Sequence, residues 1–133
     1  MPFEVDSPDG ILILARPIAP LSVDDFSVFA FEVRRLVNEA RRPAAICTDW
    51  RQAGVLTPDV YDAFVWMMRR DNPSIGGTAV LVKTGEEEQA ARMLDEGQSS
   101  RRKLCTNVDE VLEHLGPLLD PSMRDAIRAF VSD

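Results

Sequence analysis

The side chains that most often carry nucleophilic or metal chemistry are scarce in this chain. It has one histidine, His114, and two cysteines, Cys47 and Cys105. Zinc takes about four ligands and a catalytic thiol needs a base, but the sequence offers neither a second histidine nor a C-x-x-C pair. Both cysteines lie in apolar stretches, so we expect reduced, buried thiols. We therefore expect a surface histidine and predict no catalytic residue, no metal site and no cofactor.

Carboxylates are numerous, and several of them follow predicted strands. They are Asp49, Asp59, Asp62, Glu86–Glu88 and Asp109–Glu110. Open α/β sheets bind ligands at the carboxyl ends of their strands, so such a group could perform acid–base chemistry. Most of these acids also fall in the first turn of a predicted helix, where the helix dipole alone favours them. A carboxylate-dependent enzyme therefore ranks third among the functional hypotheses.

The two tryptophans are candidates for contact with a partner. Trp50 and Arg51 follow a predicted buried strand, beside the expected ligand crevice. A loop tryptophan can anchor a partner and arginine can pair with carboxylate or phosphate, although Trp50 could instead plug the end of the core. Trp66 lies in the apolar run Ala63–Met68, which is long enough to wrap around a helix. It either forms an interface or packs under the C-terminal helix.

Hydropathy periodicity predicts the elements that position these residues. The turn Pro8-Asp9-Gly10 separates two apolar segments and indicates a hairpin. Ser22, Thr84 and Asn107 each precede an acidic residue by three positions, which is typical of a capping box. The predicted strands cover residues 3–5, 11–15, 44–48, 78–82 and 103–106, and the predicted helices begin near residues 22, 57, 84, 107 and 120.

This alternation predicts an α/β fold. We expect a mainly parallel four- to five-stranded sheet with an N-terminal hairpin, covered by helices through right-handed crossovers, plus an extra C-terminal helix. The chain has 133 residues, the usual size of one domain. The α/β domain is placed at residues 1–116, and residues 117–133 are expected to form a helical appendage packed on it.

Charge and hydropathy exclude several classes of partner. The net charge is −7, with 22 acidic and 15 basic residues, which argues against nucleic acid as a partner. The longest apolar run, Ala63–Met68, is far shorter than the ~18 residues of a membrane span, so no membrane insertion is expected. The first residues lack a basic segment followed by an apolar one, which predicts a cytoplasmic protein.

Basic residues are expected to gather at one edge of the sheet. Arg41-Arg42 and Arg69-Arg70 end predicted helices, and Arg101-Arg102-Lys103 precedes the last strand. The topology places all of them at the edge opposite the acidic loops. They either complement helix dipoles or recruit an acidic partner.

Several stretches of the chain follow a family pattern. Ala45–Asp49 is a central strand ending in aspartate, Thr57-Pro58-Asp59 begins the next helix, and Thr78–Val82 and Arg102–Leu115 resemble later strands and the closing helix. Over about residues 3–116 the chain therefore resembles the STAS domains of sulfate transporters and anti-sigma factor antagonists, in particular small soluble STAS-like bacterial proteins. The resemblance implies the α/β fold and a role in protein–protein signalling.

The chain departs from this family at its regulatory position. Anti-sigma factor antagonists carry a phosphorylated Ser or Thr at the start of the helix after the central strand. The corresponding stretch here, Leu56–Val60, contains no serine, and Thr57 is its one hydroxyl. A phosphate on Thr57 would lie favourably at the positive end of a helix, but helix capping also accounts for this threonine.

The leading hypothesis is a non-enzymatic regulatory module that docks a protein partner, or a second copy as a homodimer, through the helix near residue 57 and the loop before it. Its binding residues would be Trp50, Arg51, Thr57, Asp59 and Trp66. The alternative is a small-molecule or lipid-binding protein of the same fold, since some STAS-like relatives are grouped with lipid-transfer folds. A pocket lined by Phe64, Met67 and Met68 would distinguish the alternative from the leading hypothesis.

Overall fold

A five-stranded sheet with strand order β1-β2-β3-β4-β5 forms the centre of the computed structural model, which describes residues 2–70, 72–98 and 101–132. Strands β1 and β2 are antiparallel, and the other neighbouring pairs are parallel. The elements are β1 (Phe3–Asp6), β2 (Leu12–Pro17), α1 (Val23–Glu39), β3 (Ala44–Asp49), α2 (Pro58–Met68), β4 (Ile75–Leu81), α3 (Glu88–Gly97), β5 (Arg102–Cys105), α4 (Val108–Leu115), η1 (Gly116–Leu118) and α5 (Pro121–Val131). The predicted α/β fold is confirmed.

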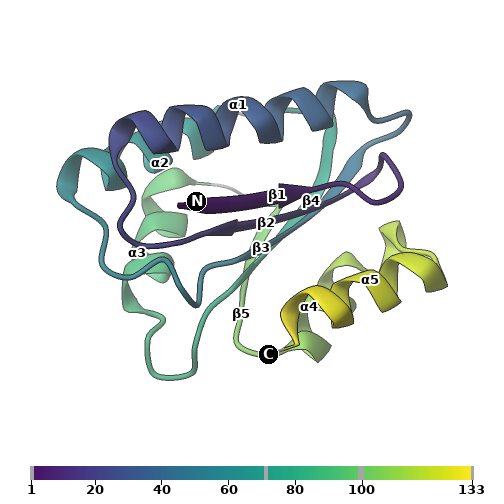
Figure 1. Ribbon diagram of the computed structural model, residues 1–133. Helices are drawn as coiled ribbons and strands as arrows, with labels where there is room; N and C mark the ends of the chain where they lie inside the picture. The colour runs from purple at the N-terminus through teal and green to yellow at the C-terminus, as the bar shows by residue number, and fades with distance from the viewer. Residues whose placement is uncertain (1, 71, 99–100, 133) are drawn as a thin grey trace.

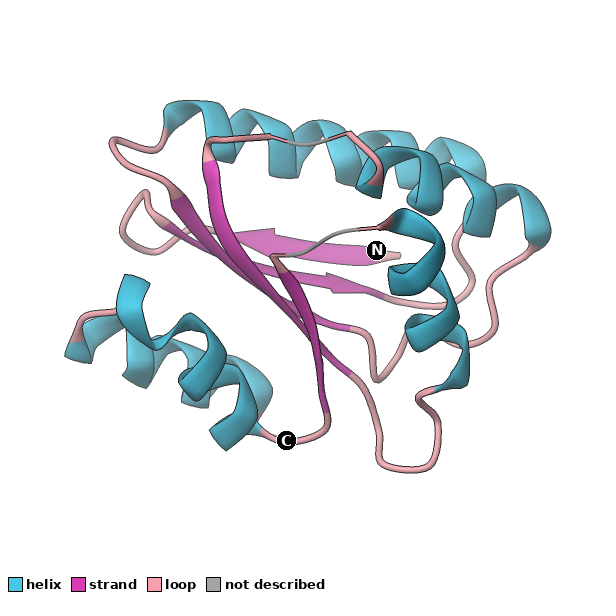
Figure 2. Ribbon diagram, turned by 180° about the vertical axis from the view of Figure 1, so that it is seen from behind, coloured by secondary structure: helices cyan, strands magenta, loops and turns pink. Residues whose placement is uncertain are grey.

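Helices cover both faces of the sheet. Helices α1, α2 and α3 lie over one face, and α4 and α5 lie over the other (Figures 1 and 2). Strand β3 is buried along its whole length because both of its faces are covered. Successive side chains of a strand point to opposite faces, so Ile46 and Thr48 face α1 and α2 while Cys47 and Asp49 face α5.

Local signals set several of the element boundaries as predicted. The Asp9 carboxylate accepts hydrogen bonds from the backbone amides of Ile11 and Leu12, and this closes the β1–β2 turn. The Ser22 hydroxyl and the Asp25 carboxylate form the expected reciprocal capping box of α1. Asn107 caps α4 through the Glu110 amide.

Two predicted caps are wrong. Helix α3 begins at Glu88, so Thr84 lies outside it and does not form a capping box. Thr57 occupies the cap position of α2 but makes no capping hydrogen bond, because its hydroxyl donates to the Asp59 carboxylate instead. The Asp59 carboxylate also accepts from the Val60 amide and serves the helix start in place of Thr57.

Helix α5 contributes to the core on its side of the sheet. Met123, Ile127 and Val131 are buried against side chains of β2 and of helix α4. In the described part of the chain, no helix has the length and apolar character that a membrane span requires.

Candidate functional site

A cavity of about 340 Å³ lies between helices α1 and α2 and the sheet. Its volume is near the lower end of the ~300–1,000 Å³ typical of ligand sites. We call it the α1–α2 cavity. The residues that line it are Ala15, Phe29, Ala30, Val33, Arg34, Val37, Asn38, Ile46, Thr48, Trp50, Phe64, Trp66, Met67, Met68, Arg70, Asn72, Ile75, Thr78, Val80 and Arg102.

The inner end of the α1–α2 cavity is buried and largely apolar. Phe64 of α2 and Val80 of β4 form walls there, and Trp50 packs against Phe64 with ring centroids 4.8 Å apart. Thr48 adds a hydroxyl, which accepts a hydrogen bond from Trp50 Nε1 at 3.1 Å. An apolar ligand body would therefore find a largely apolar wall.

The other end of the α1–α2 cavity opens to solvent. Exposed side chains line it there: Arg34 and Asn38 from α1, Trp66 from α2, and Arg70 just after α2. We call this end the mouth. Arg102, at the start of β5, also lines the cavity. Three lining residues are thus arginines, and none of the described lining residues is a carboxylate.

Arg34 and Arg70 have no counter-ion among the residues that the structure describes. Within residues 2–70, 72–98 and 101–132, neither side chain takes part in an ion pair. Arg35, next to Arg34 in the sequence, pairs with Glu32 at 2.9 Å and with Glu39 at 3.0 Å. Arg70 stacks its guanidinium on the Trp66 ring, 4.6 Å from the centroid. The mouth therefore presents positive charge that no carboxylate among the described lining residues compensates, beside an apolar interior.

The neighbouring arginines bond to the carbonyls of two helix ends and of one strand end. Arg69 Nε donates to the Glu96 carbonyl at the end of α3, and Arg102 Nη1 donates to the Met68 carbonyl at the end of α2. Arg101 Nη1 donates to the Ile75 carbonyl at the start of β4. Arg69 and Arg102 thus complement helix ends, one of the two roles expected of these residues, whereas Arg70 makes no such hydrogen bond to a described residue.

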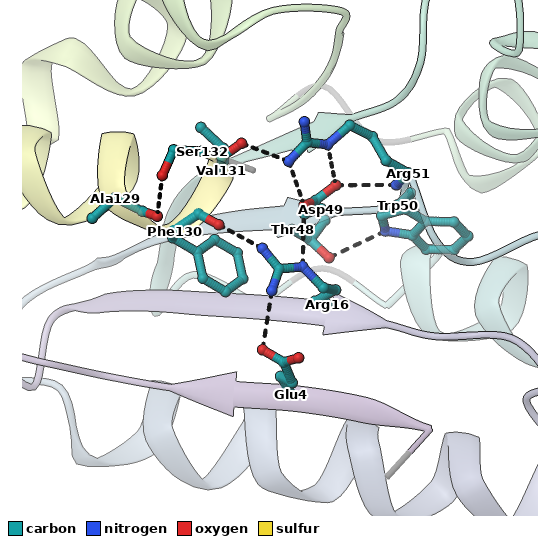
Figure 3. A network of polar contacts seen from close by, with 10 residues as sticks. All are labelled: Glu4, Arg16, Thr48, Asp49, Trp50, Arg51, Ala129, Phe130, Val131 and Ser132. Carbon is teal, nitrogen blue, oxygen red and sulfur yellow. Dashed lines mark hydrogen bonds and ion pairs between the residues drawn. The ribbon is translucent and has the colours of Figure 1, made fainter.

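A second polar site lies on the opposite face of the sheet. Asp49 is fully buried (0 % exposed) at the end of β3 and pairs with Arg16 Nε at 3.1 Å and with Arg51 Nη2 at 2.9 Å. Figure 3 shows these three residues, which we call the Asp49 cluster, beside the end of α5. Arg16 also pairs with Glu4 at 3.0 Å.

The Asp49 cluster holds the end of α5. Arg16 Nη2 donates to the Phe130 carbonyl and Arg51 Nη2 donates to the Val131 carbonyl at 2.7 Å (Figure 3). The Arg16 guanidinium also lies 4.2 Å from the centroid of the Phe130 ring. The last carbonyls of a helix lack partners within the helix and carry partial negative charge, so these contacts are favourable.

Asp49 is unsuited to acid–base chemistry. Burial raises the pKa of its carboxyl group, but side-chain and backbone hydrogen bonds from Arg51, the Arg51 charge and the Arg16 hydrogen bond outweigh burial and lower the pKa. The group is therefore ionised at neutral pH and its oxygens are occupied. Asp49 is therefore a poor candidate for the acid or base of the carboxylate-dependent enzyme considered above.

The structure divides the predicted binding residues among separate places. Trp50 is 7 % exposed and lines the cavity, so it plugs the core as the alternative interpretation stated. Arg51 belongs to the Asp49 cluster on the other face. Thr57 and Asp59 bond to each other at the start of α2. In that pair the Thr57 hydroxyl lowers the pKa of Asp59, with the Val60 amide contributing.

Trp66 is 61 % exposed, at the mouth of the α1–α2 cavity. The expectation that it packs under the C-terminal helix is wrong, because α2 and α5 cover opposite faces of the sheet (Figure 1). Within the apolar run Ala63–Met68, Trp66 alone is exposed, so the predicted exposed patch is limited to this side chain and the partly buried residues beside it. Trp66 and Thr57 lie near opposite ends of the helix, so the five predicted residues do not form one surface.

The cysteines are buried, as expected. Both thiols are free and buried, and burial raises the pKa of Cys47 to about 12 and that of Cys105 to about 11. His114 is half-buried, with Nε2 3.1 Å from the Arg101 carbonyl. Among the described residues, no group of three or more His, Cys, Asp or Glu side chains could hold a metal ion.

Sequence reasoning missed Arg34 and Asn38 at the mouth and Arg16 in the Asp49 cluster. Arg34 and Asn38 lie four residues apart, on one side of α1, and this spacing was the available signal. Arg16 carried no signal, because its partners Asp49 and Phe130 are distant in sequence.

The chain matches no protein-family model, and neither a curated protein nor a solved structure is detectably similar to it.

Proposed function

We propose that this chain is a non-enzymatic binding module whose α1–α2 cavity holds a small, largely apolar ligand. The observation that carries the proposal is the cavity itself, about 340 Å³ in volume and lined by Phe64, Met67 and Met68. A pocket with these walls is the feature that separates a small-molecule or lipid-binding protein from a module acting only through its surface. The resemblance to STAS-like proteins agrees with either role.

The chemistry of the remaining side chains supports binding over catalysis. The thiols of Cys47 and Cys105 have raised pKa values because they are buried, so they are poor nucleophiles. The Asp49 carboxylate is held by two arginines. The cavity, in contrast, offers a ligand largely apolar walls and a positively charged mouth.

Binding is tested with an uncharged apolar dye, N-phenyl-1-naphthylamine, whose fluorescence rises in apolar surroundings. The dye is expected to bind the wild-type chain. Ala30→Phe fills the cavity from α1 and is expected to weaken dye binding by about tenfold or more, ~1.4 kcal/mol.

Val28→Phe is the matched control. Val28 lies on the same helix but is exposed and does not line the cavity, so this variant adds an aromatic ring outside it. It is expected to bind the dye as the wild type does. Absence of dye binding to the wild type, or equal weakening by both variants at unchanged thermal stability, would contradict the proposal.

A second candidate function is docking of a second copy of the chain through α2. The observation in its favour is the exposed Trp66, because tryptophan is enriched at the energetic centres of interfaces. Sedimentation velocity over a range of concentrations tests it. The wild type is expected to self-associate and Trp66→Asp to remain monomeric with a nearly unchanged thermal transition. A wild type that stays monomeric at every concentration rules out this dimer.

A further inference from the structure

The α1–α2 cavity joins an apolar interior to a mouth with uncompensated positive charge. The interior is lined by buried side chains such as Phe64 and Val80. At the mouth, Arg34 comes from α1 and Arg70 from the end of α2, and within the described part of the chain neither forms an ion pair. The overall charge of the chain is −7, so this positive site is not a consequence of composition.

The arginines at the mouth differ from their neighbours Arg35, Arg69 and Arg102 in what they contact. Arg35 is paired with two glutamates, while Arg69 and Arg102 donate to carbonyls at helix ends. Arg70 instead rests on the face of Trp66, which orients a guanidinium while leaving its N–H donors available. Guanidinium groups bind carboxylate and phosphate oxygens through parallel N–H donors.

We propose that the cavity binds a small anionic amphiphile, with its hydrocarbon body against the apolar walls and its carboxylate or phosphate headgroup between Arg34 and Arg70. This inference rests on the proposed function and adds the chemical class of the ligand. Asn38 and Asn72 line the same cavity and add amide donors for headgroup oxygens. Among the described lining residues there is no carboxylate that would repel an anion.

The cavity volume limits the hydrocarbon to a short chain or a small ring system, because about 340 Å³ is near the lower limit for ligand sites. Decanoate and decanol are suitable probes, since they share a hydrocarbon body and differ in the headgroup. Decyl phosphate distinguishes a phosphate site from a carboxylate site. All three are titrated calorimetrically below their micelle concentrations into the full chain.

Decanoate is expected to bind about tenfold or more tightly than decanol, the effect of one charge-assisted hydrogen bond. The double variant Arg34→Gln, Arg70→Gln is expected to lose this preference while its affinity for decanol changes little. Arg35→Gln removes the same charge from the neighbouring position on α1 and is expected to keep the preference. If decyl phosphate exceeds decanoate, the site favours phosphate, and the reverse order assigns a carboxylate.

Equal affinity for decanoate, decyl phosphate and decanol would overturn the inference, as would a preference that survives in the double variant. These results leave the proposed function standing if the uncharged dye still binds. Failure of the dye and of every probe to bind would overturn the proposed function as well. The single variants Arg34→Gln and Arg70→Gln, both at exposed positions, serve if the double variant does not fold.

Discussion

At the scale of single residues, adjacent side chains at the end of β3 serve opposite faces of the sheet. Thr48 lines the α1–α2 cavity, and Asp49 pairs with Arg16 and Arg51 beneath α5. A buried carboxylate is tolerated only when its charge is compensated, and two guanidinium groups meet that condition here. The same guanidinium groups bond to the last carbonyls of α5. Asp49 thus helps to position α5 indirectly, through the two arginines that it holds.

Asp49→Asn is expected to destabilise the chain by about 3–5 kcal/mol at pH 7, the usual cost of removing one partner from a buried ion pair. The effect depends on pH because the pKa of Asp49 is lowered in the folded state. The stabilisation is complete above the unfolded-state pKa, about 4, and is lost as pH falls through the folded-state value. Urea unfolding at several pH values is therefore expected to show a smaller difference between wild type and variant in acid.

Glu4→Gln provides the control for this experiment. Glu4 pairs with the same Arg16, but its side chain is exposed, so its loss is expected to cost less than about 1 kcal/mol. A constant difference between wild type and Asp49→Asn from pH 7 down to pH 3 would contradict the ionised pair. Equal costs for the Glu4 and Asp49 variants would also contradict it.

At the scale of elements, helices α2 and α3 approach closely at Gly97. A Cβ atom built on Gly97 would lie 2.7 Å from Met68 Cβ, which no rotation of the Met68 side chain relieves. Gly97→Ala is therefore expected to push α2 away from α3 and to destabilise the chain by about 1–3 kcal/mol, the usual cost of overpacking. Thermal unfolding followed by circular dichroism measures the loss.

Gln98→Gly, at the next position, is expected to act in the opposite direction. Gln98 ends α3 in the left-handed conformation with φ 52°, which costs an L-residue about 1–2 kcal/mol and costs glycine little. If Gln98→Gly stabilises the chain and Gly97→Ala destabilises it, the loss in Gly97→Ala comes from the close approach of α2 and α3. It then does not reflect a general sensitivity of this helix end to substitution. A higher melting temperature in Gly97→Ala would contradict the close approach of Gly97 to Met68.

Most elements of the fold could be predicted from the sequence because the signals are local. Apolar runs such as Ala44–Thr48 are typical of strands covered on both faces, and Ser22 with Asp25 sets the start of α1. The start of α3 could not be predicted, because Thr84 and Glu87 match a capping pattern that the chain does not use. The predicted Thr57 cap failed similarly, since the hydroxyl donates its hydrogen bond to a carboxylate two residues away.

The candidate site was less predictable than the fold. Phe64, Met67 and Met68 were named as the walls that a pocket would have if the chain were a small-molecule or lipid-binding protein, and all three line the α1–α2 cavity. The volume of a cavity depends on how closely the side chains of separate elements pack against one another, and no local sequence pattern determines this packing. The Asp49 cluster joins β2, β3 and α5, so its partners could not be deduced from spacing either.

At the scale of the whole molecule, arginines connect elements that are distant in the sequence. Arg69 bonds to the end of α3, Arg102 to the end of α2, and Arg16 and Arg51 to the end of α5. Each contact places a fixed positive charge at the negative end of a helix. Arg34 and Arg70 lie outside this scheme, and both line the cavity. Their charge is consequently available to a ligand rather than committed to the fold.

The two faces of the sheet are expected to act independently, because the α1–α2 cavity and the Asp49 cluster share no arginine. A ligand that binds only the folded chain stabilises it by about 2.7 kcal/mol at a concentration a hundred times its Kd. Decanoate at that concentration is expected to produce this increment in the wild type and an equal one in Arg51→Gln, whose own stability is lower. Urea unfolding with and without decanoate measures both increments. A smaller increment in Arg51→Gln would show that the Asp49 cluster and the cavity are coupled through β3, since Thr48 and Asp49 are adjacent on that strand.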